Sequence, residues 1–345
     1  MSEHAEPRAR VLVLDDYEGA MRRSPHLAAL AGSIELETLS EPVGPDELAE
    51  RVEGVPFVVA IRERTRMTAE VLARMCGVEL LLQTGGHAYH IDVPAATRHG
   101  VLVALGRGSK ASPSPVVAEL VVGLMIAWYR NLVPAVTGMR AGEWPASLGR
   151  LLHGRTIGVL GFGRHGVLTA RLASALGMTV LAWSPTLTPE RAAAGQAQAV
   201  DLDTLLERAD VVSVHVPLKP ETVGLIGARE LRLMGPDTLL VNTSRGPVVD
   251  EAALVDALSA RTIEGAALDV FDQEPLPPGH PLRALDNVLC TPHLGYTVDA
   301  AFGDFAETTA AQLRAYLDHD LDPRLVLDPE VARARPGVWG GLREA

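Results

Sequence analysis

Two doubly wound α/β domains, each built on a parallel sheet, are the fold that this 345-residue sequence predicts. Short apolar runs alternate with segments of helical pattern along most of the chain, which is typical of parallel sheets covered by helices on both faces. A polar stretch rich in Gly, Pro and Ser at residues 106–115 interrupts this alternation once. We interpret that stretch as a hinge between the two domains.

The elements follow in a regular order. We expect five strands in the first series of apolar runs, at residues 11–14, 34–39, 57–61, 79–83 and 101–104. A long apolar helix from Val116 to about Leu132 follows the hinge. The second series predicts six strands, at residues 156–160, 179–183, 211–215, 238–242, 265–270 and 288–291. A helix from Asp299 to about Leu317 then precedes a tail, from Pro329 onward, that we expect to be mobile.

Composition excludes several classes of partner. The net charge of −12 disfavours binding to nucleic acid or to an anionic membrane surface. The N-terminus has no apolar core of signal-peptide length, and the apolar stretch from Val116 to Trp128 contains Glu119 and is too short to span a bilayer. We therefore expect a cytoplasmic protein. Cys76 and Cys290 have no metal-ligand spacing and are interpreted as buried, reduced thiols, so no metal site is expected.

A glycine-rich turn follows the first strand of the second series. Gly161, Gly163 and Gly166 form the pattern GxGxxG in GFGRHG, directly before a helical run. The first glycine permits a tight turn, the second lets a pyrophosphate approach the backbone, and the third lets the helix pack on the strand. The helix N-terminus offers N–H groups to phosphates, and Arg164 can add a charged contact. The motif, with His165, predicts a dinucleotide site; a tight turn with chance glycines is the plainer alternative.

Ser184 is the residue expected to meet the adenosine ribose. An acidic residue commonly stands there, about 20 residues after the glycine motif, and accepts hydrogen bonds from the ribose hydroxyls. A serine does not repel a 2′-phosphate, and residues 185 and 186 include no arginine to attract one. The sequence therefore leaves NAD and NADP open, with NAD favoured.

Three polar residues each follow a strand of the second series, where ligands of doubly wound sheets bind: Arg245, Glu274 and His293. An arginine can hold a carboxylate through two parallel donors. A histidine can give or take a hydroxyl proton, and a glutamate bonded to it fixes its tautomer and stabilises its protonated form. Singly, each could be a salt bridge, a solvated charge or a buried histidine. Taken together, and close to a nucleotide-binding loop, the three residues predict hydride transfer to a carbonyl group that is adjacent to a carboxylate.

The strings GFGRHG, VHVPL, NTSRGPVVD, ALDVFDQEPLP and TPHLG, in this order between residues 80 and 300, resemble the D-isomer-specific 2-hydroxyacid dehydrogenases. This family includes phosphoglycerate, glycerate and D-lactate dehydrogenases. The resemblance implies an NAD(P)-dependent oxidoreductase that interconverts a small 2-hydroxy acid and its 2-keto acid. It also implies a homodimer formed largely through the nucleotide domains.

The resemblance further implies how the domains and site are organised. A Rossmann nucleotide-binding domain, residues 109–296, would be inserted into a flavodoxin-like substrate domain of residues 1–108 and 297–330, leaving a tail at 331–345. Arg245, Glu274 and His293 would be the catalytic set. The cofactor would be lined by Val216, Pro217, Thr243, Ser244, Asp269 and Gly295, beside the glycine motif.

By the same resemblance, TGGHAYHID at residues 84–92 is the substrate loop, in which Gly85, Gly86 and His87 would hold the substrate carboxylate through backbone amides. A glycine-rich turn after a strand is the alternative. This chain departs from the family pattern: His87 and His90 stand where Gly and Asn are often found, and Ser184 replaces the common Asp.

Other functions remain compatible with parts of this pattern. The family also resembles dinucleotide-sensing corepressors, which can keep the catalytic residues, although no long extension or partner-binding motif is evident here. Formate dehydrogenases of the family carry a glutamine at the place of Glu274, which counts against formate, while phosphite oxidation stays open. A methyltransferase would leave Arg245, Glu274 and His293 unexplained.

Overall fold

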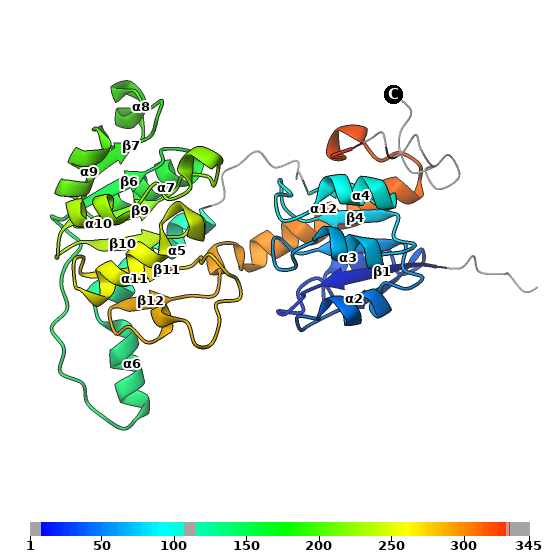
Figure 1. Ribbon diagram of the computed structural model, residues 1–345, viewed down its shortest axis with the longest axis horizontal. Helices are drawn as coiled ribbons and strands as arrows, with labels where there is room; N and C mark the ends of the chain where they lie inside the picture. Colours follow the sequence, from blue (N-terminus) through cyan, green and yellow to red (C-terminus); the bar gives the residue numbers. More distant parts are fainter. Residues whose placement is uncertain (1–7, 107–114, 329–330, 332–345) are drawn as a thin grey trace, which may run out of the picture. The chain divides into compact units, whose positions relative to one another are not determined.

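The computed structural model describes residues 8–106, 115–328 and 331. The chain divides into two compact units, one formed by residues 1–111 and 298–345 and the other by residues 112–297 (Figure 1). Most of the expected hinge, at residues 107–114, and the expected tail apart from Val331 lie outside the described residues. Each unit contains one all-parallel sheet, which confirms the predicted fold class.

Unit 1, the unit of residues 1–111 and 298–345, has a five-stranded sheet in the order β2-β1-β3-β4-β5. This is the flavodoxin-like order. Its strands are β1 (Ala9–Leu14), β2 (Ile34–Thr38), β3 (Phe57–Ala60), β4 (Leu80–Gln83) and β5 (Leu102–Leu105). The strands β3, β4 and β5 are buried along their whole length, as apolar runs covered on both faces must be.

The helices of unit 1 lie on both faces of this sheet. They are α1 (Pro25–Ala28), α2 (Pro45–Arg51), α3 (Ala69–Arg74), α4 (Val93–His99) and α12 (Asp299–Leu317), the last of which brings the chain back to unit 1. The helix α1 packs on α12, whereas α3 packs on α2 and α4. Local sequence sets the ends of α4, because Asp92 accepts from Ala95 N at 2.9 Å and Gly100 ends the helix at φ 72°.

Unit 2, residues 112–297, has a seven-stranded sheet in the order β12-β11-β10-β9-β6-β7-β8. Starting from β6, this is the Rossmann order with one further strand at the edge. The strands are β6 (Thr156–Leu160), β7 (Thr179–Trp183), β8 (Gln198–Ala199), β9 (Val211–Val214), β10 (Leu239–Asn242), β11 (Gly265–Leu268) and β12 (Val288–Cys290). The sequence did not predict β8, because two residues carry no periodic pattern.

The helices of unit 2 are α5 (Val116–Tyr129), α6 (Leu132–Arg140), α7 (Arg164–Ala175), α8 (Pro189–Ala194), α9 (Leu202–Arg208), α10 (Ala228–Met234) and α11 (Glu251–Ser259). The helices α5 and α7 pack together, and α10 packs on α9 and α11. Short 3-10 turns occur at Gly246–Val248 and Leu294–Tyr296, directly after Arg245 and His293.

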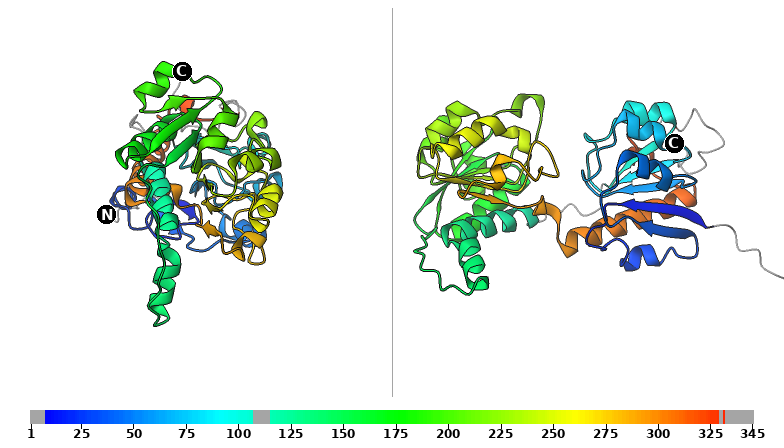
Figure 2. Two further views of the ribbon diagram at one scale, coloured as in Figure 1. Left: turned by 90° about the vertical axis from the view of Figure 1, so that its left-hand side faces the viewer. Right: turned by 60° about the horizontal axis from the view of Figure 1, so that its bottom comes forward.

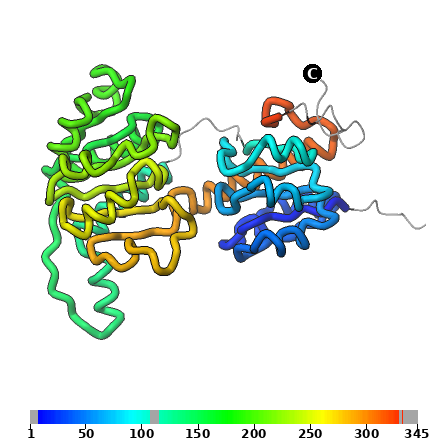
Figure 3. The backbone as a smooth tube through the Cα atoms, in the orientation of Figure 1, coloured from blue at the N-terminus to red at the C-terminus, as the bar shows by residue number. Residues whose placement is uncertain are grey.

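The prediction of one long helix from Val116 to about Leu132 is wrong at the C-terminal end of that helix. The helix α5 stops at Tyr129, and Asn131 adopts a left-handed conformation with φ 51°, after which α6 starts at an angle of 66°. Figure 3 shows the chain leaving the body of unit 2 through α6 and returning along an extended segment. Among the described residues, no single helix is long and apolar enough to cross a membrane, although α5 and α6 together pass that test as a bent pair.

The expectation that both cysteines are buried is also wrong. Cys76 and Cys290 are both exposed free thiols. Cys76 lies in the turn after α3, and Cys290 is the last residue of β12, which is an edge strand with one neighbour. The exposure of a cysteine depends on where its element lies in the fold, which the absence of metal-ligand spacing does not determine.

Candidate active site

The glycine turn after β6 has the geometry that close approach of a phosphate requires. Gly161 has φ 103°, and a Cβ there would lie 2.7 Å from Val216 N, so only glycine fits. A Cβ on Gly166 would collide with the carbonyl oxygen of Gly161, so this glycine lets α7 pack against the turn. Gly163, the N-cap of α7, has no atom within 4 Å of where its Cβ would be, which leaves space for a ligand at the helix N-terminus.

The helix α8 carries a further basic residue, Arg191, that reaches the loop after β7. Ser184 follows the last residue of β7, Trp183, and Arg191 of α8 folds back so that its Nη1 donates to Thr186 O at 2.8 Å. The fold-back is possible because Thr188 is the N-cap of α8 and accepts from Arg191 N at 3.3 Å. The Thr-Pro pair before Arg191 was the sequence signal for a helix start at this place.

A second group of polar atoms lies beside the glycine turn. Ser213 Oγ and His215 Nε2 are 2.9 Å apart, and burial, with a smaller contribution from the charge of His165, lowers the pKa of His215 to about 3. Ser244 Oγ donates to Val216 O, which joins the loop after β10 to the loop after β9. Pro217, next in the chain, is exposed.

Thr243 supplies an observation that points to a ligand. Its side chain is buried, and its Oγ1 has no hydrogen-bond partner among the described residues. Buried hydroxyls are normally satisfied, so an external partner is expected. The open space at Gly163 and this unpaired hydroxyl are both compatible with a dinucleotide bound to unit 2.

The backbone of the loop after β10 is fixed by Asn242. Its Oδ1 accepts from Ser244 N at 3.0 Å, and its Nδ2 donates to Arg245 O at 3.0 Å. A Cβ on Gly246 would collide with the carbonyl group of Phe271, so the loop that carries Arg245 packs directly on the segment after β11. Local sequence does not identify these two residues: the bonds of Asn242 depend on the conformation of the loop, and the close approach at Gly246 depends on Phe271, which is distant in sequence.

Glu274 and His293 are in direct contact. Glu274 Oε2 lies 2.6 Å from His293 Nδ1, while Glu274 Oε1 accepts from Phe271 N at 2.9 Å. One carboxylate oxygen is therefore fixed to the backbone and the other orients the imidazole. The edge of Tyr296 packs near the imidazole, with ring centroids 5.4 Å apart.

The turn that carries His293 is held by Asp269. This carboxylate is fully buried and accepts from Thr291 Oγ1 at 2.5 Å, from Leu294 N at 2.7 Å and from Gly295 N at 2.8 Å. Burial raises the pKa of Asp269, although the three hydrogen bonds act in the opposite direction. The Asp269 side chain therefore fixes the backbone directly after His293, which adopts a left-handed conformation with φ 54°. Its predicted place beside the cofactor stays a prediction.

The expected substrate loop belongs to unit 1, directly after β4. Gln83 Nε2 donates to His87 O at 3.2 Å, and the ring of His87 stacks on that of Tyr89 with centroids 4.3 Å apart. Gly85 is buried and Gly86 follows it at the carboxyl end of the sheet. The structure therefore brings Arg245, Glu274 and His293 into adjoining loops of unit 2, and Gly85, Gly86 and His87 into one loop of unit 1.

A Rossmann sheet with this glycine turn and a Glu-His pair at its carboxyl edge defines a dinucleotide-dependent oxidoreductase. The family model of the D-isomer specific 2-hydroxyacid dehydrogenase, NAD binding domain, matches residues 122–295, and the chain belongs to this family.

Two curated relatives and one solved structure illustrate the similarity. The chain is 43% identical over 260 residues to a glyoxylate reductase of Thermofilum pendens, covering 72% of this chain and 74% of that protein. It is 34% identical over 309 residues to a D-3-phosphoglycerate dehydrogenase of Methanocaldococcus jannaschii, covering 89% of this chain but 57% of that protein. A phosphoglycerate oxidoreductase of Vibrio cholerae shares its fold with a TM-score of 0.84 and 34% identity, covering 90% of this chain and all of that one.

The protein is therefore an NAD-dependent D-2-hydroxyacid dehydrogenase, and NAD(H) is its cofactor. The predicted family and the predicted class of enzyme are both confirmed by these comparisons.

Proposed function

We propose that the protein reduces a small 2-keto acid at C2 to the D-2-hydroxy acid, and catalyses the reverse oxidation. NADH supplies the hydride when it is bound. The single observation that carries the proposal is the 2.6 Å contact of Glu274 Oε2 with His293 Nδ1 at the carboxyl edge of a Rossmann sheet. The relative from Thermofilum pendens, which is named a glyoxylate reductase, supports a small substrate.

We assign the proton transfer to His293. Because Nδ1 is held by Glu274, Nε2 is the nitrogen that donates a proton to the carbonyl oxygen in reduction and accepts it from the hydroxyl in oxidation. Glu274 stabilises the protonated imidazole and keeps the ring in one orientation. Asp269 and the turn at Leu294–Tyr296 fix the backbone at His293.

We assign binding of the substrate carboxylate to Arg245 and to the amides of Gly85, Gly86 and His87. A guanidinium provides two parallel donors to a carboxylate, and backbone amides add directional contacts. Asn242 Nδ2 donates to the carbonyl oxygen of Arg245, which fixes the backbone position from which the guanidinium extends. Residues 112–297 would then be the NAD-binding domain, inserted into a substrate domain formed by the two parts of unit 1.

The dinucleotide would be held by the glycine turn, by Ser184, and by the segment at Val216 and Pro217. We assign a hydrogen bond with the ligand to Thr243, because its buried hydroxyl has no partner among the described residues. Ser244 supports this segment through its bond to Val216 O.

The test is a coupled measurement of turnover and stereochemistry. NADH absorbance is followed with glyoxylate, hydroxypyruvate, pyruvate and bulkier 2-keto acids, and the chiral products are resolved. We expect turnover with at least one small 2-keto acid and the D-hydroxy acid as product. Binding of NADH without any turnover would instead favour a dinucleotide-sensing role, and L-product would contradict the assignment.

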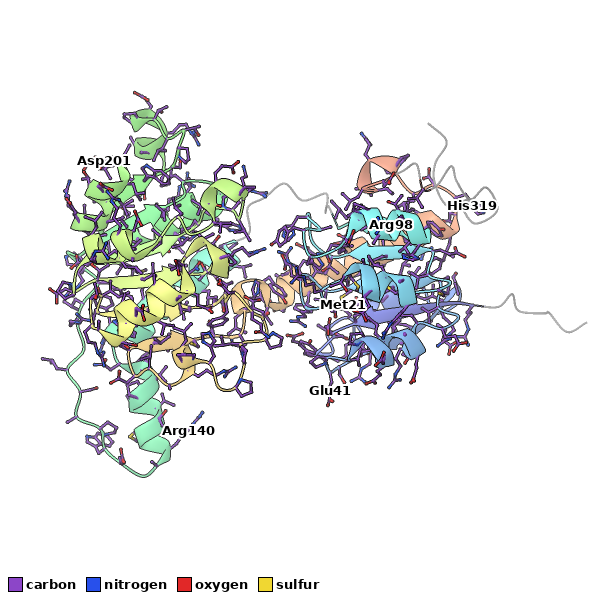
Figure 4. All side chains as sticks on the ribbon, in the orientation of Figure 1. Met21, Glu41, Arg98, Arg140, Asp201 and His319 are labelled. Carbon is purple, nitrogen blue, oxygen red and sulfur yellow. The ribbon has the colours of Figure 1, made fainter. Side chains whose placement is uncertain are left out.

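We further propose a homodimer built through α6 and the segment that follows it. In Figures 1 and 2 this region projects from the body of unit 2, and Arg140 marks the end of α6 in Figure 4. Its large apolar side chains are unusually exposed: Leu132 44%, Val133 49%, Val136 49%, Met139 52%, Trp144 87%, Leu148 94% and Leu151 70%. An apolar patch of this extent is typical of a surface covered in the assembled protein.

The oligomeric state tests this surface. We expect the unaltered protein to have the mass of a dimer by light scattering, and Val136→Glu with Met139→Glu to have the mass of a monomer, because burying carboxylates at an apolar contact is costly. Val223→Glu is the matched control, since Val223 is 59% exposed but lies outside this region. A monomeric unaltered protein, or a dimer that persists in the double variant, contradicts the proposal.

A further inference from the structure

Glu63 lies at the centre of a polar cluster beside the loop to which we assign the substrate carboxylate. Its side chain is only 11% exposed, although Glu63 lies in the loop after β3. Glu63 Oε1 lies 3.1 Å from His87 Nε2 and accepts from Tyr89 OH at 2.9 Å. Glu63 Oε2 lies 3.5 Å from Nε of Arg62. One carboxylate thus joins Arg62 and two rings of the loop.

Arg62 is pressed against the same loop. Its backbone N donates to Thr84 Oγ1 at 3.0 Å, and its Nη2 lies 3.3 Å from His87 Nε2. A Cβ on Gly85 would lie 2.6 Å from Nη1 of Arg62, so the guanidinium lies directly against Gly85. A second charged group on a small substrate whose carboxylate is held at Gly85 would lie within a few covalent bonds of this cluster, and would therefore interact with its charges.

Resting on the proposed function, we propose that Glu63 is a specificity-determining residue that selects 2-keto acids whose only charged group is the carboxylate. The formal charges of Arg62 and Glu63 cancel, so this pair offers no net positive charge to a phosphate. Phosphate dianions are held best by guanidinium groups with donors directed at them. Here the carboxylate at the centre of the cluster repels a phosphate, and repulsion of one ligand is an effective basis of selection.

The neighbouring arginine follows the same pattern. Arg64 Nη1 and Nη2 donate to the two oxygens of Glu18 at 2.8 and 2.7 Å, and Nη1 also donates to Asp15 O at 2.6 Å. The side chain of Arg64 is only 10% exposed. The charge of this second arginine is thus also balanced by a carboxylate, which supports glyoxylate or hydroxypyruvate as substrate rather than a phosphorylated keto acid.

The experiment compares hydroxypyruvate with 3-phosphohydroxypyruvate, which differ by the phosphate, in the full-length protein with NADH. We expect the unaltered protein to have the higher kcat/KM for hydroxypyruvate. Glu63→Gln keeps a hydrogen-bond acceptor but removes the negative charge, so the ratio of kcat/KM for the phosphorylated to the unphosphorylated substrate should rise by about tenfold or more, as expected for one charge at a few ångströms.

Two control variants separate charge from structure. Tyr89→Phe removes the hydrogen bond to Glu63 Oε1 without changing the charge. Whatever it does to the activity on each substrate, it should leave the ratio within about twofold, because the Coulomb interaction with a phosphate is unchanged. Glu37→Gln makes the same charge change at a carboxylate on β2, which is paired with Arg10 and Arg51. This variant should also leave the ratio unchanged.

The outcomes distinguish the two proposals. A preference of the unaltered protein for the phosphorylated substrate, or an unchanged ratio in Glu63→Gln, overturns the role of Glu63 while the proposed reaction stands. Equal rises in Glu63→Gln and Glu37→Gln also overturn it, because a general change in net charge would then explain the effect. Failure of the unaltered protein to reduce any 2-keto acid refutes the proposed function and this inference with it.

Discussion

His293 Nδ1 lies 2.6 Å from Glu274 Oε2, and the other oxygen of that carboxylate accepts from Phe271 N. The imidazole is therefore oriented by a side chain that is itself fixed to the backbone after β11. Asp269, which also follows β11, accepts from the backbone N–H groups of Leu294 and Gly295, directly after the histidine. The side chain and the backbone of His293 are thus positioned by two carboxylates that both follow β11.

The first prediction concerns the two residues assigned to chemistry and substrate binding. His293→Ala and Arg245→Ala should each reduce kcat/KM for the best 2-keto acid by at least about 10²-fold, since general acid catalysis typically contributes 10²–10⁴. The Kd for NADH, from fluorescence titration, should change little. Near-normal turnover by His293→Ala would remove the acid/base role.

The second prediction concerns Glu274. Glu274→Gln should retain more activity than His293→Ala, because an amide can still bond to the imidazole, but it cannot stabilise the positive charge. The alkaline limit of keto-acid reduction should consequently move to lower pH. Glu251→Gln is a matched control, because Glu251 Oε1 lies 3.1 Å from His280 Nε2 in a second pair of the same kind. Equal pH profiles for Glu274→Gln and the unaltered protein would separate Glu274 from His293.

The two series of apolar runs sufficed to predict both sheets, because strands buried on both faces leave an uninterrupted apolar signal. The ends of these strands also located Arg245, Glu274 and His293. The positioning residues were harder to predict: Asn242 and Gly246 act through contacts between loops, and nothing in their local sequence indicates those contacts.

The errors have similar physical origins. The apolar character of residues 116–132 continues across the end of α5, so hydrophobicity alone could not reveal the left-handed turn at Asn131. Cys290 follows apolar residues but lies on an edge strand, and edge position depends on the order of strands in space. The contact of Arg191 with Thr186 O could not be predicted either, because it depends on how α8 starts after the loop.

The third prediction uses the space at Gly163. Gly163→Ala should leave the midpoint of thermal unfolding nearly unchanged, because its φ of −87° suits alanine and no atom lies within 4 Å of the new Cβ. The methyl group would project where we place the pyrophosphate, so the Kd for NADH should rise by about tenfold, which corresponds to 1.4 kcal/mol. Gly166→Ala is the contrasting variant and should destabilise the protein. Unchanged NADH affinity in Gly163→Ala would place the phosphates elsewhere.

The fourth prediction concerns stability at acid pH. Burial lowers the pKa of His215 to about 3 from an ordinary value of 6.5, so the unfolded chain binds a proton below pH 6.5 that the folded chain does not. This residue therefore makes the protein less stable as pH falls from 6.5 toward 3. Between pH 6.5 and 5 the loss is about 2 kcal/mol.

His215→Gln should remove this loss while keeping a partner for Ser213. Denaturant unfolding followed by tryptophan fluorescence at pH 7.5 and 5 tests it, because Trp128, Trp144 and Trp183 all belong to unit 2. His153→Gln, at an exposed histidine of the same unit, is the control and should behave as the unaltered protein. The same acid-induced loss in His215→Gln and in the control would show that other groups cause it.

The last prediction concerns the selection between NADH and NADPH at Ser184. A serine neither repels a 2′-phosphate nor holds the ribose hydroxyls as a carboxylate does, so we expect the preference between the two cofactors to be weak. Residues 185 and 186 include no arginine to pair with a phosphate, so we expect NADH to be favoured, with measurable turnover of NADPH. Arg191, anchored at 2.8 Å on Thr186 O, brings a guanidinium to the loop that starts at Ser184. Arg191→Ala should therefore reduce kcat/KM for NADPH more than for NADH, because a guanidinium pairs strongly with phosphate. Ser184→Asp should lower NADPH use further through like-charge repulsion while sparing NADH. Steady-state kinetics with both cofactors in all three proteins measures this, and an unchanged NADH to NADPH ratio in Ser184→Asp would mean that residue 184 does not face the ribose.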